Sequence, residues 1–263
     1  MLRLLRHPLR LFTRLSGFLF TVCQVSCAYF QLKVQGPISP DDRESWMHQS
    51  AIRLSKALRV EITVCGNIPE KGLIASNHLS YIDIVVIASI APGIFVSKNE
   101  VRYWPIIGFL STWAGTLYLR RDRRADVANV GRRIVDNLMA ERRVIVFPEG
   151  TSSNGREVLP FHSSLFSPSI KTKTPVTPCQ LSYSEPGDDP ENLVCYWGSM
   201  LFLTHFLKLL TLDSIQATLT FGEEIHEHQN RKQLAKLAHQ QVIELGSNAS
   251  APKLTITMSD HKR

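Results

Sequence analysis

Residues 73–83 read LIASNHLSYID, a short apolar run that ends in a polar loop. Similar short runs, bounded by turn residues, recur along the chain, and each is typical of a buried strand. They lie at Val60–Val64, Leu73–Ser76, Ile94–Val96, Thr116–Leu119, Val144–Phe147 and Ile215–Thr220. The segments between these runs decide how the strands are connected.

Helical patterns separate the runs. Ser39 is typical of an N-cap, because Pro40 follows it and Asp42 lies three residues on, and this helix is expected to reach about Leu58. Two later segments carry apolar residues three or four positions apart, which predicts amphipathic helices. Their stripes are Val127, Val130, Ile134 and Leu138, and Leu234, Ala238, Val242 and Leu245. Strands that alternate with helices predict an α/β fold, a single domain with a largely parallel central sheet flanked by helices.

Length and composition narrow the class of protein. The chain has 263 residues, of which 44% are hydrophobic, enough for one sizeable core, so wholesale disorder and a polytopic membrane protein are both excluded. Its 30 basic residues exceed its 23 acidic ones and leave a net charge of +7. Such an excess fits a nucleic acid, an anionic membrane or a CoA-like substrate. The absence of a nucleic-acid-binding motif argues against the first.

The first 36 residues combine basic and apolar character. Four arginines, at positions 3, 6, 10 and 14, precede the uncharged stretch 15–32, and the first acidic residue is Asp41. At 18 residues this stretch is short for a span, which needs about 20. We expect segment 1–36 to be a membrane-associating helix on the cytoplasmic face, either as a single span or as an amphipathic helix in the leaflet. A buried helix of the domain is the alternative, and a signal peptide is disfavoured because no Ala-x-Ala-like site follows. The remainder divides into a domain at 37–247 and a polar tail at 248–263.

Metal and disulfide chemistry are not indicated. The five cysteines are scattered and odd in number, which predicts small buried apolar residues in a reducing compartment. His226 and His228 flank Glu227 without further ligands nearby, so a solvated turn is favoured over a metal site. We therefore expect neither a metal nor a bound cofactor.

The polar loop after the second run holds a possible base. His78 follows an apolar strand, and Asp83 comes five residues later at a predicted helix start. Asp83 could accept a hydrogen bond from one ring nitrogen, so that the other takes a proton from a hydroxyl. A structural histidine beside an aspartate is the competing interpretation.

Three other segments could contribute to a site. Residues 147–155, FPEGTSSNG, follow a strand and can turn backbone N–H groups toward an anion, although an ordinary glycine-rich turn has the same composition. The strand GTLYLRR, residues 115–121, ends in arginines that could fork onto a phosphate or simply form a solvated edge. Pro175 and Pro178 lie three apart in an extended segment and could form a rigid wall.

These four blocks, in this order, resemble the glycerolipid acyltransferase family typified by 1-acylglycerol-3-phosphate acyltransferase. The resemblance covers about residues 62–245, and its first and third blocks are the specific ones. The matching positions are Asn77, His78 and Asp83; Gly115, Tyr118 and Arg120 or Arg121; Phe147 through Thr151; and Pro175 and Pro178, with Lys98 and Glu100 between the first two blocks. Tyr118 replaces the usual Phe, and Arg121 competes with Arg120 for the family's arginine.

The resemblance implies acyl transfer from acyl-CoA or acyl carrier protein to a lysolipid hydroxyl. His78 would be the general base and Asp83 its orienter. The implied substrate-binding residues are Asn77, Lys98, Gly115, Arg120, Arg121, Glu149, Gly150 and Thr151. Because the chain has no Gly-x-Ser-x-Gly elbow, direct attack by the hydroxyl is preferred to an acyl-serine. Backbone N–H groups near the helix after Asn77 would bind the oxyanion.

The acceptor implied first is 1-acylglycerol-3-phosphate, which would yield phosphatidic acid. Ser152 stands where many such enzymes have arginine, and residues 151–166 also look like lyso-ornithine-lipid acyltransferases, the chief alternative. A non-catalytic lipid-binding homologue and a lipid or thioester hydrolase are the other rivals. The sequence predicts membrane lipid and an acyl donor as partners, and it predicts no oligomeric state.

Overall fold

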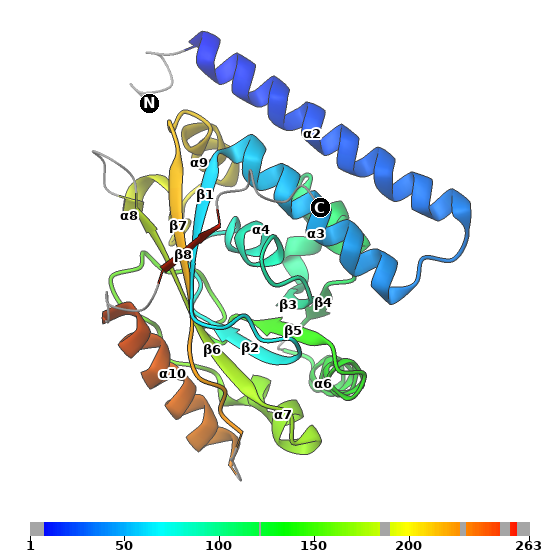
Figure 1. Ribbon diagram of the computed structural model, residues 1–263, viewed down its shortest axis with the longest axis vertical. Coiled ribbons are helices and arrows are strands. Elements are labelled where there is room, and N and C mark those ends of the chain that lie inside the picture. Colours follow the sequence, from blue (N-terminus) through cyan, green and yellow to red (C-terminus); the bar gives the residue numbers. More distant parts are fainter. Residues whose placement is uncertain (1–7, 121, 185–189, 227–229, 248–252, 257–263) are drawn as a thin grey trace.

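An eight-stranded sheet runs through the centre of the protein (Figure 1). The computed structural model describes residues 8–120, 122–184, 190–226, 230–247 and 253–256. In chain order the strands are β1 Val60–Cys65, β2 Gly72–Ser76, β3 Ile94–Lys98, β4 Leu117–Leu119, β5 Arg143–Val146, β6 Val176–Ser184, β7 Ile215–Phe221 and β8 Lys253–Ile256. Their order across the sheet is β4-β3-β5-β2-β6-β7-β1-β8. Among the described strands the β6–β7 and β1–β8 pairs are antiparallel and the other five pairs are parallel, which confirms the largely parallel sheet.

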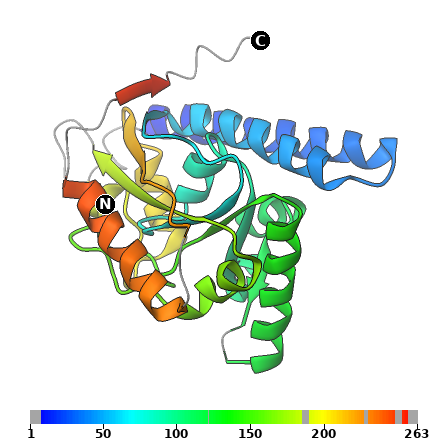
Figure 2. The same cartoon turned by 60° about the horizontal axis from the view of Figure 1, so that its bottom comes forward.

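Helices cover both faces of this sheet. They are α2 Pro8–Gln35, α3 Pro40–Leu58, α4 Asp83–Ala88, α5 Ile107–Trp113, α6 Arg124–Met139, α7 Ser167–Thr172, α8 Pro190–Leu193, α9 Phe202–Leu209 and α10 Arg231–Ser247, with 3-10 turns at Asn99–Tyr103 (η1) and Ser163–Phe166 (η2). Figure 2 shows α2 and α3 on one side of the sheet and α6 and α10 on the other. The single α/β domain flanked by helices is therefore confirmed.

Alternation along the strands builds a separate core on each face. On β2, Ile74 packs into the core beneath α3 and α4, whereas its neighbours Leu73 and Ala75 pack into the core beneath α6 and α10. Successive strand residues point to opposite faces, so a strand covered on both sides reads as one continuous apolar run. This explains why residues 73–75 are all fully buried.

The helix predicted after Ser39 begins and ends as its sequence indicates. The Ser39 hydroxyl accepts from the Asp42 N–H at 3.1 Å, and the Asp42 carboxylate accepts from the Ser39 N–H at 3.3 Å. This reciprocal capping box satisfies two N–H groups that have no partner within the helix. Arg59 ends α3 in the left-handed conformation, directly before β1.

Helix α2 lies along α3 and buries one stripe of its surface (Figure 1). Phe18, Val22, Val25 and Tyr29, spaced by four, three and four residues, are buried. The Trp46 indole on α3 donates to the Val25 carbonyl at 2.9 Å. In length and composition α2 could also cross a bilayer, and it is the one such helix among the described residues.

The basic end of α2 has partners within the protein. The Arg10 guanidinium pairs with the Asp213 carboxylate, and Arg14 donates to the Asp213 carbonyl at 3.5 Å. Asp213 lies in the turn before β7, so these contacts join α2 to the rest of the domain. Arg3 and Arg6 lie outside the described residues.

One expectation is wrong, and two segments form strands that the sequence did not predict. The cysteine prediction is wrong for Cys23 and Cys27, which are exposed on α2, although Cys65, Cys179 and Cys195 are buried. The extended segment around Pro175 becomes β6, a nine-residue strand in the middle of the sheet. The polar tail contributes β8, which pairs with β1.

Gly66 and Gly131 give a paired test of the fold. Gly66 follows β1 with a φ of +79°, and a Cβ built on it would lie 2.2 Å from the Phe221 carbonyl oxygen. We expect Gly66→Ala to lower the free energy of unfolding by about 2–4 kcal/mol. Gly131, within α6, has no atom within 4 Å of such a Cβ, so Gly131→Ala should raise it by about 0.5–1 kcal/mol. Urea titration measures both, and equal stability of the two variants would contradict this packing.

Candidate active site

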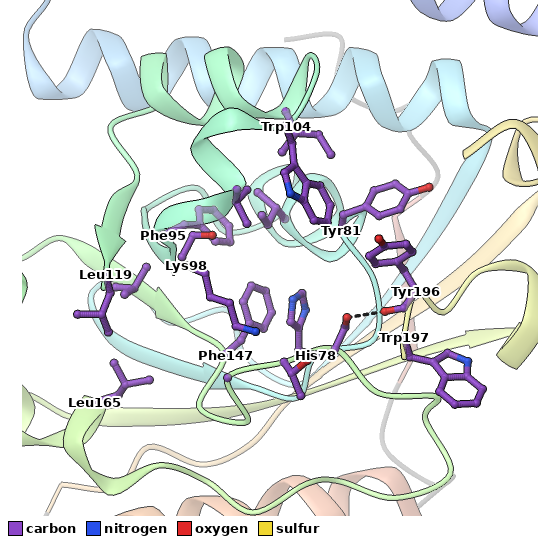
Figure 3. A pocket seen from close by; sticks show the side chains of 18 of the residues that line it. His78, Tyr81, Phe95, Lys98, Trp104, Leu119, Phe147, Leu165, Tyr196 and Trp197 are labelled. Atoms are coloured by element: carbon purple, nitrogen blue, oxygen red, sulfur yellow. Dashed lines mark hydrogen bonds between the residues drawn. The ribbon is translucent and has the colours of Figure 1, made fainter. Parts of the chain in front are cut away.

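His78 and Asp83 form a hydrogen-bonded pair at the carboxyl end of β2. His78 Nδ1 lies 2.8 Å from Asp83 Oδ2. Because an ionised carboxylate can only accept, Nδ1 carries the proton, and the lone pair of the neutral ring is on Nε2. The ring stacks on Phe147 with centroids 4.2 Å apart, and Figure 3 shows it pointing into a cavity. The arrangement is that of an oriented base facing an open space.

The Asp83 carboxylate is held by the loop that precedes it. It is 0% exposed, and its Oδ2 also accepts from the backbone N–H groups of Leu79 at 2.7 Å and Ser80 at 3.0 Å. Hydrogen bonds from N–H groups stabilise the charged form of a buried carboxylate. The tight loop therefore fixes the direction of the Asp83 carboxylate.

The cavity in front of His78 has a volume of about 310 Å³. One part of its wall is aliphatic and includes Val96. Leu119 and Leu165 belong to the same part (Figure 3). Aromatic rings dominate another part, namely Tyr81, Trp104, Tyr196 and Trp197. Lys98, Ser97, Thr151 and Ser152 supply the polar side chains, and Lys98 is the one lining residue with a permanent positive charge in the described part of the chain. Such a cavity suits an amphipathic molecule with a small polar head.

Glu149 binds the backbone of His78 from outside the cavity. Its Oε1 accepts from the His78 N–H at 2.9 Å, its Oε2 has no partner among the described residues, and the residue is 4% exposed. Burial raises the pKa of Glu149 to about 7, against the lowering effect of nearby backbone N–H groups, that of His78 first. Glu149 does not line the cavity, whereas its neighbours Gly150 and Thr151 do.

Asn77 joins the catalytic loop to β6. Its amide nitrogen donates to the Leu181 carbonyl at 2.9 Å, and its amide oxygen accepts from the Leu181 N–H at 2.7 Å. This pair of bonds continues the β2–β6 ladder by one position beyond the strand. Asn77 therefore fixes the position of the backbone that leads into His78. It does not line the cavity.

The arginine block lies apart from the cavity in this structure. Arg120 pairs with Asp126, and neither Arg120 nor Gly115 lines the cavity. Gly115 instead packs its backbone, at a φ of +82°, against the Arg43 side chain. Arg121 lies outside the described residues. Of the predicted substrate-binding residues, Lys98, Gly150 and Thr151 line the cavity with His78.

Comparison with known proteins agrees with this geometry. The acyltransferase family model matches residues 59–182. A lyso-ornithine lipid O-acyltransferase of Pseudomonas aeruginosa is 33% identical over 205 residues, 77% of this chain and 79% of that protein. The chain belongs to the acyltransferase family. A 1-acyl-sn-glycerol-3-phosphate acyltransferase of Neisseria gonorrhoeae is also 33% identical to this acyltransferase, over 44% of this chain and 45% of that one.

A solved structure supports the fold of this acyltransferase. The 1-acyl-sn-glycerophosphate (LPA) acyltransferase PlsC from Thermotoga maritima superimposes with a TM-score of 0.64, at 21% identity. The match covers 94% of this chain and 99% of that one. The uncovered 6% of the chain is shorter than the 28 residues of α2, so the match includes at least part of that helix.

Sequence reasoning missed the aromatic wall and one residue behind the pair. Tyr196 and Trp197 lie in the loop after α8, and Trp104 ends η1, so no periodic pattern marked them. Tyr183 donates to Asp83 Oδ1 at 2.7 Å from a strand that was not predicted. If the pairing of β6 with β2 had been recognised, it would have placed Tyr183 beside Asp83.

The buried carboxyl of Glu149 predicts a dependence of stability on pH. Its pKa of about 7 exceeds the ordinary 4.5, so between these values the folded state binds a proton that the unfolded chain has lost. Stability contributed by this group is full at low pH and falls as pH rises toward 7. Glutamine does not titrate. The free energy of unfolding of Glu149→Gln, relative to that of the wild type, should therefore rise by about 2–3 kcal/mol from pH 5 to pH 8.

Denaturant titrations at the two pH values measure that change. Glu157→Gln, at an exposed glutamate, is the matched control and should show no such change. If the difference in free energy of unfolding between Glu149→Gln and the wild type were the same at both pH values, the raised pKa would be contradicted.

Proposed function

We propose that this acyltransferase transfers a fatty acyl group from a thioester, acyl-CoA or acyl carrier protein, to the hydroxyl of a lysolipid. The observation that carries the proposal is the bond between His78 Nδ1 and the fully buried Asp83, which leaves Nε2 as the basic nitrogen beside the cavity. A non-catalytic lipid carrier has no use for a base held in one tautomer.

The pair can run both proton transfers of the reaction. His78 Nε2 takes the proton of the acceptor hydroxyl while its oxygen attacks the thioester carbonyl, and Asp83 stabilises the imidazolium that forms. The tetrahedral intermediate then expels the thiolate, which receives the proton from Nε2. An ester and a free thiol result, and His78 returns to its neutral form.

The oxyanion needs hydrogen-bond donors that are not already engaged. The Leu79 and Ser80 N–H groups, near the helix after Asn77, are occupied by Asp83. The Thr151 and Ser152 N–H groups donate to no described acceptor, and both residues line the cavity. We assign the oxyanion to these two N–H groups.

The cavity favours a lyso-ornithine lipid as acceptor. Lys98 matches a single carboxylate, and the faces of Tyr81, Trp104 and Tyr196 suit an ammonium group by cation–π attraction. Ser152, which stands where many lysophosphatidate enzymes carry arginine, is engaged with the Tyr196 carbonyl. The Pseudomonas relative, aligned over most of both chains, is named for this acceptor.

1-Acylglycerol-3-phosphate is the second candidate acceptor. The Neisseria relative named for it is equally identical over its shorter match. Its phosphate carries more negative charge than a carboxylate, and Lys98 is the one permanently charged cation among the described residues that line the cavity. The two acceptors thus differ in the positive charge they require.

We propose that α2 lies in the surface of the membrane on its cytoplasmic side. Its exposed apolar residues are Leu9, Phe12, Leu19, Phe20, Phe30 and Val34. They lie away from the stripe that packs on α3, so the helix has one face for the domain and one for lipid. An interfacial helix also delivers lipid substrates without removing them from the bilayer.

Replacing the base tests the mechanism. We expect His78→Ala to lower kcat by about 10²–10⁴-fold, the usual contribution of a general base, while the thermal midpoint stays close to that of the wild type. Release of thiol from acyl-CoA or acyl carrier protein in the presence of a lysolipid measures the rate. His226→Ala, at an exposed histidine after β7, should keep full activity. A fully active His78→Ala enzyme would rule out the mechanism.

An acceptor panel tests the head group. We expect kcat/KM for lyso-ornithine lipid to exceed that for 1-acylglycerol-3-phosphate at least tenfold, with products identified by mass spectrometry. Lys98→Gln should raise KM about tenfold for the preferred acceptor, because one charged hydrogen bond is lost. Arg102→Gln, at an exposed cation that does not line the cavity, is the control. Preference for the phosphate would reverse the assignment, and free fatty acid as the main product would indicate a hydrolase.

A further inference from the structure

Tyr183 contacts the catalytic pair from the side opposite to its loop. It lies on β6, 100 residues from Asp83 in sequence, and its hydroxyl donates to Asp83 Oδ1 at 2.7 Å. It is 8% exposed and does not line the cavity that His78 faces. A side chain in this place cannot touch the substrates in that cavity, so any influence on the reaction must pass through Asp83.

The two oxygens of Asp83 are held very differently. Oδ2 accepts from His78 Nδ1 and from the N–H groups of Leu79 and Ser80, all within five residues of it. Oδ1 has Tyr183 as its one hydrogen-bond donor in the described part of the chain. Without the phenol, Oδ1 would be a buried charged oxygen with no partner, which is costly inside a protein.

The Tyr183 phenol stays protonated and so remains the hydrogen-bond donor to Asp83. Burial and the neighbouring Asp83 charge raise the pKa of its phenol well above the ordinary range. It therefore keeps its proton at every pH at which the enzyme works. The carboxylate, in turn, has no proton to donate while it is ionised.

We propose that Tyr183 is a positioning residue for catalysis, the third member of a chain that runs from His78 through Asp83 to the phenol. Its hydrogen bond stabilises the pair in the state with a neutral imidazole and an ionised carboxylate, which is the state that accepts the substrate proton. It also fixes the plane of the carboxylate so that Oδ2 faces His78. This inference rests on the proposed role of His78 as the base.

Other titratable groups near the pair must be separated from this effect. Glu149 lies behind His78 with a pKa of about 7, and Lys98 faces the cavity. Tyr81 and Cys195 act on Tyr183 electrostatically. Of these, Glu149 is the one whose titration falls near the rising limb of a pH–rate profile.

The test is the pH dependence of kcat/KM in Tyr183→Phe. Loss of the donor destabilises the ionised pair, so the pair binds a proton more readily and the acid limb moves to higher pH, by about one unit. Activity at pH 7 should fall by up to tenfold and return toward the wild-type level above pH 8.5. A purely structural tyrosine would lower the thermal midpoint and leave the limb in place.

Two controls and one further variant make the outcome decisive. Tyr29→Phe, at a buried tyrosine of α2 that makes no contact with Asp83, should not move the limb. Tyr183→Phe should shift the acid limb by the same amount in a Glu149→Gln background as in the wild type. If Tyr183→Phe does not fold, 3-fluorotyrosine at position 183, a stronger donor of the same shape, should move the limb to lower pH.

An unmoved acid limb in a folded Tyr183→Phe or fluorotyrosine enzyme would overturn this inference and leave the general base intact. Retained activity in His78→Ala would instead overturn the base itself. The two failures are therefore distinguishable in the same assay.

Discussion

A carboxylate with no exposure to water is the constraint on which this site depends. Asp83 is 0% exposed, and an ionised group in such a place is stable only when its oxygens are paired with donors. Four donors meet it: the His78 ring, two backbone N–H groups of the loop and the Tyr183 phenol. Because they come from β2, its loop and β6, the carboxylate is satisfied only when the sheet is assembled around it.

The strand order supplies those donors. β2 lies between β5 and β6 and is parallel to both, so the carboxyl ends of all three strands reach one edge of the sheet. β2 delivers His78 there, the loop after β5 delivers Glu149 behind it, and β6 delivers the phenol of Tyr183. Asn77 fixes this register, because its side-chain amide donates to the Leu181 carbonyl and accepts from the Leu181 N–H. The site is thus a property of three neighbouring strands rather than of one motif.

Local patterns were enough to predict most of the elements but not the partners that complete the site. The strand before His78 and the helix at Ser39 follow from apolar runs and capping residues that act within a few positions. Tyr183 was not predicted, because its role depends on a contact between residues about 100 positions apart. β6 was also hard to identify, since Pro178 interrupts a segment that the rest of the sheet places next to β2. Arg14, in the segment expected to associate with the membrane, bonds to Asp213 through a contact of the same long-range kind.

The same packing argues against a helix α2 that crosses the membrane on its own. Its buried stripe is tied to α3 through the Trp46–Val25 hydrogen bond and the stacking of Tyr29 on Trp113, 4.6 Å apart. A transmembrane orientation would break these contacts, because α3 carries Asp41, Asp42 and Glu44 and cannot follow α2 into hydrocarbon. In the interface plane α2 keeps its stripe on the domain and offers Phe12 and Phe20 to lipid. In this proposed position α2 keeps the catalytic domain at the bilayer surface, where its lipid substrates lie.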